Sequence, residues 1–164
     1  MKQFFDTKRI ARAGVIAGLY ALLSLITFPI ASGAVQFRVS EGLTLLALVF
    51  PEAVPALFIG CVISNIITGC GVLDVILGSL ITLISALLTF FTARNIKNTP
   101  LKIIVGGIYP VMLNAFFLPL IWLMYTSLEY VYYIQVALLL VGQSLSVYAV
   151  GAPLYLFIKK RKHE

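Results

Sequence analysis

Apolar positions along this chain form long continuous runs, each long enough to cross a lipid bilayer. The runs cover about residues 10–30, 43–67, 72–93, 103–125 and 131–158, and each carries few charges. About 20 apolar residues in a helix span the hydrocarbon core of a membrane. This pattern therefore predicts an all-α integral membrane protein.

The second run is interrupted near its start by Pro51, Glu52 and Pro55. Two prolines four residues apart, with an acid between them, fit poorly into the interior of a helix. Pro51 suits the first turn of a new helix, and Glu52 suits its positive dipole end. Dividing the run there gives six predicted transmembrane helices in one compact bundle, at about 9–30, 39–50, 52–68, 72–94, 102–125 and 130–158.

The composition agrees with lipid as the surrounding solvent. Of the 164 residues, 61% are hydrophobic and only 11% are charged, whereas an ordinary soluble domain carries roughly 25% charged residues. The length allows a single transmembrane domain, 1–164, and leaves no room for a soluble catalytic or nucleotide-binding domain.

The cationic residues gather in three places: residues 2–12, residues 94–102 and residues 159–162. The positive-inside rule then makes the N- and C-termini both cytoplasmic, which requires an even number of spans and favours six. Of the twelve Lys and Arg residues, Arg38 alone falls on the outer side. The net charge of +6 thus reflects cytoplasmic loops, and no nucleic acid is expected as a partner.

Ionisable side chains within the membrane are functional candidates, because each costs at least about 2.5–3.5 kcal/mol at the bilayer centre. Arg38, Glu41 and Asp74 all lie near outer helix ends in this threading. A bound small molecule would explain Arg38. Alternatively, Arg38 and Glu41 are close enough in sequence to form a purely structural ion pair along one helical turn.

Three amides extend the candidate site: Asn65, Asn114 and Gln143 lie on three different predicted helices. An amide in lipid must form hydrogen bonds, so each either joins helices or faces a shared cavity. By contrast, the hydroxyl stripe on the helix at 72–94 is more typical of helix packing; its members are Ser79, Thr82, Ser85, Thr89 and Thr92.

Small residues follow one side of the first predicted helix, and they allow close approach of another helix. Either a helix of the same chain or a partner subunit could dock there. These residues are Ala13, Gly14, Ala17, Gly18 and Ala21.

The sequence offers no catalytic constellation, so an enzyme is not expected. His163 is the only histidine, and Cys61 and Cys70 lack metal-site spacing. No metal or cofactor is expected, and without a phosphate-binding loop the chain cannot itself hydrolyse ATP.

The block from Val35 to about Leu80 reads VQFRVSEGLTLLALVFPEAVPALFIGCVISNIITGCGVLDVILGSL. It resembles the QueT family of queuosine precursor transporters. The six predicted helices and the small-residue face of the first helix are similar to the substrate-binding (S) components of energy-coupling factor (ECF) transporters.

The resemblance implies a bacterial plasma-membrane subunit that captures a queuosine precursor, a 7-deazaguanine base, outside the cell. It also implies docking, through the small-residue face, on a transmembrane coupling subunit with two ATPase subunits, where ATP is used. In such a site Glu41 or Asp74 would accept the donors of the base, and Arg38, Asn65 or Gln143 would donate to its carbonyl. The aromatic residues expected to stack on the ring are Phe37, Trp122 and Tyr125. For Trp122 and Tyr125 an interfacial aromatic belt is the alternative.

Two other functions remain open at this stage. The chain could be an S component for another vitamin-like heterocycle. It could also be a stand-alone ion-coupled transporter or channel, with Asp74 as the coupling acid.

Overall fold

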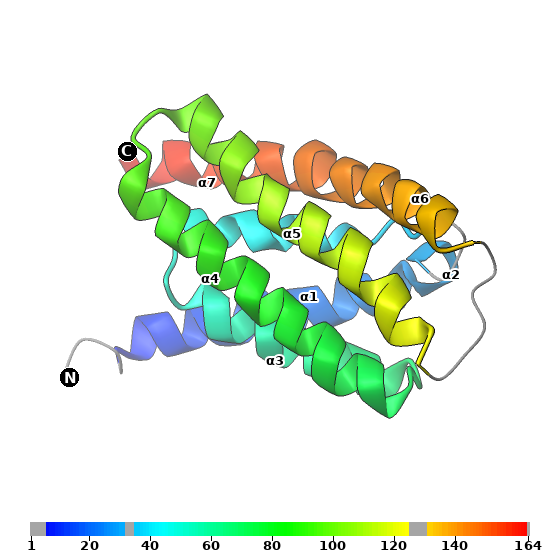
Figure 1. Cartoon of the computed structure of the whole chain (residues 1–164). Coiled ribbons are helices and arrows are strands. Elements are labelled where there is room, and N and C mark those ends of the chain that lie inside the picture. The colour runs from blue at the N-terminus through cyan, green and yellow to red at the C-terminus, as the bar shows by residue number, and fades with distance from the viewer. Residues whose placement is uncertain (1–5, 32–34, 125–130, 164) are drawn as a thin grey trace.

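The computed structural model describes residues 6–31, 35–124 and 131–163, and every element in these ranges is helical (Figure 1). Four helical segments are long and apolar enough to cross a membrane, and two shorter apolar helices, Val39–Leu48 and Ala53–Ile67, accompany them. The elements in chain order are α1 Thr7–Ile26, α2 Phe28–Ala31, η1 Val39–Leu48, α3 Ala53–Ile67, η2 Asp74–Gly78, α4 Ser79–Asn95, α5 Thr99–Trp122, α6 Tyr132–Ser144, η3 Leu145–Gly151 and α7 Ala152–His163.

The observed bounds lie close to the predicted ranges, and local capping explains the differences. α1 ends before Thr27, whose hydroxyl donates to the Leu23 carbonyl at 2.7 Å. α5 begins earlier than predicted because the Asn98 side chain accepts a hydrogen bond from the Leu101 amide. The predicted helix at 72–94 is η2 followed by α4, and the one at 130–158 consists of α6, η3 and α7.

The short helix η1 is a 3-10 helix rather than the expected α-helix. Its ten residues rise about 2.0 Å each, so η1 extends about 20 Å, whereas an α-helix of this length would extend about 15 Å. Residues 40–48 are all buried, and η1 runs through the middle of the bundle, behind α5 in Figure 1. A Cβ on Gly42 would lie 2.7 Å from the Ser146 carbonyl oxygen, so a glycine is needed where η1 meets η3.

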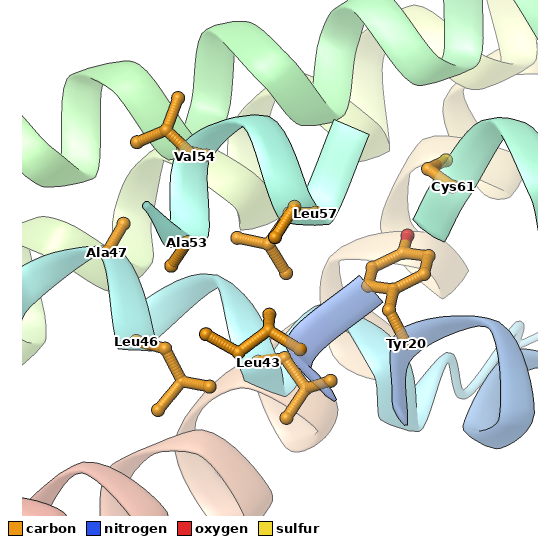
Figure 2. Close-up of a cluster of buried hydrophobic side chains, with 11 residues drawn as sticks. Tyr20, Leu43, Leu46, Ala47, Ala53, Val54, Leu57 and Cys61 are labelled. Carbon is orange, nitrogen blue, oxygen red and sulfur yellow. The ribbon is translucent and has the colours of Figure 1, made fainter. Parts of the chain in front are cut away.

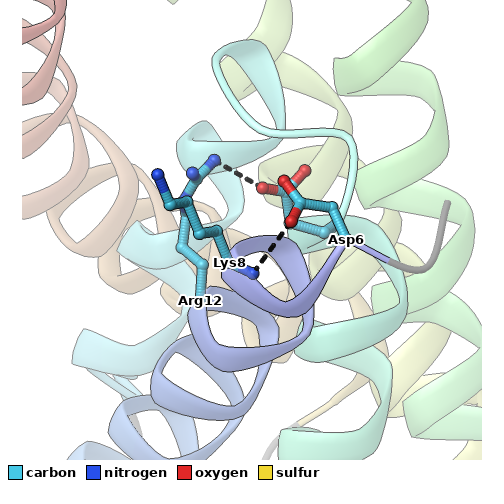
Figure 3. Close-up of polar contacts among 4 residues, drawn as sticks. Asp6, Lys8 and Arg12 are labelled. Carbon is cyan, nitrogen blue, oxygen red and sulfur yellow. Dashed lines mark hydrogen bonds and ion pairs between the residues drawn. The ribbon is translucent and has the colours of Figure 1, made fainter. Parts of the chain in front are cut away.

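The break at Pro51 separates η1 from α3, and an ion pair joins this point to α1. Glu52 stands at the N-terminus of α3, where a negative charge is favourable. Its Oε1 also accepts from Arg12 Nη1 at 2.5 Å (Figure 3). Six residues before Arg12, Asp6 caps α1, and its side chain accepts a hydrogen bond from the Lys8 amide at 3.3 Å.

The two ends of the bundle differ in what they carry. The start of α1, the connection between α4 and α5, and the end of α7 lie together at one end in Figure 1. α2 and the turn between α3 and η2 lie at the opposite end. The cationic segments therefore gather at one end of the molecule, while Arg38 precedes η1 near the other.

The outer surface is strongly apolar. Large side chains such as Val15, Ile66, Ile104 and Phe157 are more than half exposed. A surface of this kind is expected to contact lipid, because a soluble monomer rarely exposes extended apolar patches. The interior is apolar too; its cluster between α1, η1 and α3 is drawn in Figure 2.

Candidate functional site

A cavity of about 340 Å³ lies at the end of the bundle opposite the start of α1 and the end of α7. This volume is typical of small-molecule sites, which occupy roughly 300–1,000 Å³. We call it the open pocket. Its walls come from α1, α2, the segment before η1, α3, η2 and α5, and its polar side chains include Tyr20, Ser24, Thr27, Gln36, Arg38, Ser40, Ser64, Asn65, Thr68, Asp74 and Trp122.

Asp74 is held firmly in one wall of the open pocket. Its residue is 6% exposed, and its Oδ1 accepts a hydrogen bond from Trp122 Nε1 at 3.1 Å. Asn65 Nδ2 donates to the Asp74 backbone carbonyl, also at 3.1 Å. These contacts bring together the predicted site residues Asn65, Asp74 and Trp122 from α3, η2 and α5.

Arg38 lies on the segment that leads into η1 and lines the same pocket. It does not form the structural ion pair with Glu41 that the sequence left open. The described residues instead form an ion pair between Arg12 and Glu52, at the other end of the bundle. Arg38 and Asp74, a basic and an acidic residue, therefore line the same pocket.

Glu41, a candidate ligand contact from the sequence, lies behind the wall of the open pocket. It is 0% exposed, does not line the open pocket, and accepts from the Tyr20 hydroxyl at 2.6 Å. Thr44 and Thr82 add longer hydrogen bonds of 3.4 and 3.5 Å to its carboxylate. Tyr20, which does line the pocket, stands between the cavity and Glu41 because η1 turns Glu41 inward, toward α1 and α4.

The remaining predicted site residues also lie outside the walls of the open pocket. Asn114 and Gln143 are 1% and 0% exposed, deep in the bundle. Phe37 is partly buried beside the pocket-lining segment but is not part of the wall. Tyr125 lies outside the described residues.

Sequence reasoning missed Tyr20, Ser24, Gln36 and Cys70 as wall residues. Tyr20 occurs within an apolar run and gave no polar signal. Gln36 adopts a φ of 48°, in the left-handed region that non-glycine residues rarely occupy. The Gln36 segment packs on α6 at Gly142, where a Cβ would overlap the Val35 carbonyl oxygen.

The small residues of α1 divide between two surfaces. Ala21, one of the residues predicted to dock a partner, is 8% exposed and packs inside the chain. Gly14 and Gly18 are exposed, and a Cβ added to either would have no atom within 4 Å. Ala13 and Ala17 lie between these surfaces and, with Gly14, line an apolar groove of about 570 Å³ between α1 and the start of α3.

The described residues contain no group of three or more His, Cys, Asp or Glu side chains that could hold a metal ion. The polar groups of the open pocket are instead suited to a small organic molecule. Arg38 offers donors, Asp74 offers acceptors, and the Trp122 ring offers a flat face.

The fold and the pocket define a multi-pass protein of the cell membrane with a polar pocket at one end of its helical bundle. The family model described as "QueT transporter" matches residues 10–160. The chain belongs to this family.

A curated relative, the queuosine precursor transporter QueT of Lactococcus lactis subsp. cremoris (strain MG1363), is 39% identical over 80 residues. The aligned segment covers 48% of this chain and 47% of the relative, so the chain matches about half the length of that protein. No solved structure matches the chain.

Proposed function

We propose that this chain is the substrate-binding subunit of an ECF-type importer and that it captures a queuosine precursor, a 7-deazaguanine base, from outside the cell. The observation that carries the proposal is the family match over residues 10–160 together with a polar pocket that contains both Arg38 and Asp74. The name of the Lactococcus relative supports the substrate class.

The chain crosses the membrane six times in this proposal. The crossings are α1, η1, α3, η2 with α4, α5, and α6 with η3 and α7. The gathering of the basic segments at one end of the bundle supports a cytoplasmic position for both termini. The open pocket then faces the outside, which suits a capture site.

The groups in the pocket match the chemistry of an aminomethylated deazaguanine. Arg38 supplies hydrogen-bond donors for an acceptor atom of the ligand, and the Trp122 ring offers a stacking face. The Asp74 carboxylate binds the cationic aminomethyl group in a charge-assisted hydrogen bond. Asn65 holds Asp74 in place through its backbone carbonyl.

Energy for uptake comes from two partner ATPase subunits through a transmembrane coupling subunit. The groove between α1 and α3 supports this part of the proposal, because it is apolar and is lined by Ala13, Gly14 and Ala17. Small residues let a partner helix approach closely in a membrane. The groove lies toward the end of the bundle with the basic segments, where a partner can contact the cytoplasmic side.

The test is direct binding by the purified chain in detergent, measured by calorimetry. The panel contains queuine, the 7-aminomethyl and 7-cyano derivatives of 7-deazaguanine, guanine, riboflavin and thiamine. Tight binding of a deazaguanine, with much weaker binding of guanine, is the expected result. Binding of riboflavin or thiamine instead would keep the S-component class and reject the substrate.

Uptake measurements distinguish the importer from a stand-alone carrier. Vesicles that contain only this chain should not accumulate a precursor, and vesicles that also contain the coupling subunit and both ATPases should do so with ATP. Ion-driven accumulation by the chain alone would contradict the proposed mechanism. In that case Asp74 would be the candidate for the ion-coupling acid.

A further inference from the structure

Several polar side chains deep in the bundle have no hydrogen-bond partner. Asn114 Nδ2 and both polar atoms of the Gln143 amide are buried and unpaired, as are the hydroxyls of Ser79 and Ser85. These four residues are at most 1% exposed. Unpaired buried polar groups are strongly unfavourable, and a membrane supplies no water from its lipid side. Such groups therefore indicate a place where another polar molecule is bound.

The height of Asn114 along the bundle axis follows from two contacts between α4 and α5, which run antiparallel. Thr89 Oγ1 donates to the Gly106 carbonyl at 2.8 Å toward one end of this helix pair. Trp122 Nε1 bonds to Asp74 toward the other end. Asn114 stands midway between Gly106 and Trp122 along α5, so it lies midway between the two anchoring contacts.

Thr82 occupies the same level on α4, about midway between Asp74 and Thr89. Its hydroxyl lies 3.5 Å from Glu41 Oε1, and at the same distance from Cys61 Sγ. The level of Asn114 is therefore also the level of the buried carboxylate of Glu41.

Gln143, on α6, lies at the same height along the bundle axis as Glu41. On one side of it, Gly142 packs against the Val35 carbonyl. On the other side, the Ser146 carbonyl packs against Gly42 of η1. Gln143 thus lies alongside the chain between Val35 and Gly42, the stretch that contains Glu41. Four elements contribute to one polar layer, whose members are Glu41, Thr82, Asn114 and Gln143.

Tyr20 separates this layer from the open pocket. Its residue is 2% exposed and lines the pocket, while its hydroxyl bonds to Glu41 on the inner side. Figure 2 shows the Tyr20 hydroxyl close to Cys61. Cys61 in turn receives a hydrogen bond of 3.5 Å from Asn65, another wall residue of the open pocket. The pocket and the inner layer are therefore neighbours across a thin partition.

We infer that the layer of Glu41, Thr82, Asn114 and Gln143 is an inner compartment of the binding site, and that it receives the hydrogen-bonding edge of a guanine-like base. The inference rests on the proposed function and adds to it a second subsite. Glu41 accepts from the ring N–H and the exocyclic amino group, a bidentate pairing that a carboxylate provides well. The amides of Asn114 and Gln143 supply donors for the carbonyl of the base.

Tyr20 turns aside when the base enters, and the base replaces its hydrogen bond to Glu41. The substituent of the deazapurine ring then remains in the open pocket, near Asp74. This arrangement divides recognition into two parts. The inner compartment identifies the guanine edge, and the open pocket identifies the substituent.

Leucine substitutions at the two amides test this inference, because a ligand role and a structural role predict opposite results. Asn114→Leu and Gln143→Leu remove unpaired polar groups, so each variant should melt at the same or a higher temperature than the wild-type protein. Each should nevertheless bind 7-deazaguanine about tenfold or more weakly. The wild-type preference for 7-deazaguanine over 7-deazahypoxanthine should remain in both variants, because 7-deazahypoxanthine keeps the carbonyl and lacks only the amino group that Glu41 accepts from.

Thr89→Val is the matched control. Thr89 is as deeply buried as the amides, on α4, but its hydroxyl is already paired with Gly106. This variant should melt at a lower temperature and keep the wild-type affinity and preference. If the leucine variants do not purify as folded protein, Gln143→Met and Asn114→Ser replace them and are judged by the same criteria.

The outcomes separate the inference from the proposed function. Wild-type affinity for 7-deazaguanine in the folded Asn114 and Gln143 variants would overturn the inner compartment and leave the deazaguanine assignment intact. Failure of the wild-type protein to bind any deazaguanine would overturn the proposed function, and the inner compartment with it.

Discussion

The Tyr20 hydroxyl donates a 2.6 Å hydrogen bond to the Glu41 carboxylate, joining α1 to the central helix η1. Both residues are at most 2% exposed. A buried carboxylate is tolerated in an apolar bundle only where donors surround it, and Thr44 and Thr82 supply the other two. This contact marks the inner limit of the open pocket.

Replacing Tyr20 by phenylalanine should destabilise the protein. The change removes the shortest hydrogen bond of Glu41 and keeps most of the ring packing, so the expected loss is about 1–3 kcal/mol of unfolding free energy. Thermal unfolding in detergent measures it. Tyr132→Phe is the control, because that hydroxyl bonds to the Phe116 carbonyl at an exposed position. Equal losses in the two variants would mean that Glu41 does not depend on Tyr20.

Replacing Asp74 by asparagine should change ligand preference more than stability. An asparagine can still accept the Trp122 hydrogen bond, but it lacks the charge that a cationic substituent needs. Affinity for the 7-aminomethyl precursor should fall by about tenfold or more, and affinity for the uncharged 7-cyano precursor should change less. Calorimetry with both ligands checks this. Asp6→Asn, at an exposed position, serves as the control. An equal loss of affinity for both ligands would contradict a role of the Asp74 charge in binding the cationic substituent.

Gly142→Ala should displace the pocket-lining segment that packs against α6. The added Cβ would overlap the Val35 carbonyl oxygen, so the segment that carries Arg38 must move, at a cost of about 1–3 kcal/mol. Both melting temperature and precursor affinity should fall. Gly18→Ala is the matched control, because nothing lies within 4 Å of its new Cβ, and alanine favours a helix by up to about 1 kcal/mol. A stable Gly142→Ala variant with normal affinity would show that this close contact is unnecessary.

A bulky residue at Gly14 should prevent assembly with the coupling subunit and spare ligand binding. Gly14 is exposed and lines the groove between α1 and α3, and it is not part of the wall of the open pocket. Gly14→Trp is therefore expected to bind precursor normally but to co-purify poorly with the partner subunits. Ile108→Trp, at an exposed position on α5, controls for a large side chain on the outer surface. Normal assembly of Gly14→Trp would move the docking surface elsewhere.

The sequence was sufficient for the features that depend on local chemistry. Long apolar runs identified the helices, and Pro51 with Glu52 located the break between η1 and α3, because proline and helix dipoles act over a few residues. The charge pattern singled out Arg38, and the cost of a charge in lipid made Asp74 a site candidate. Both residues line the open pocket.

The tertiary structure decided which polar residues share a cavity. Sequence spacing allowed Arg38 and Glu41 to pair, yet the 3-10 geometry of η1 and its burial turn Glu41 toward Tyr20, while Arg38 faces the pocket. It also decided that Ala21 packs inside the chain and that Gly14 remains outside. Helix register and side-chain direction arise from contacts between distant segments, and hydrophobicity along one segment carries no information about the partner it will meet.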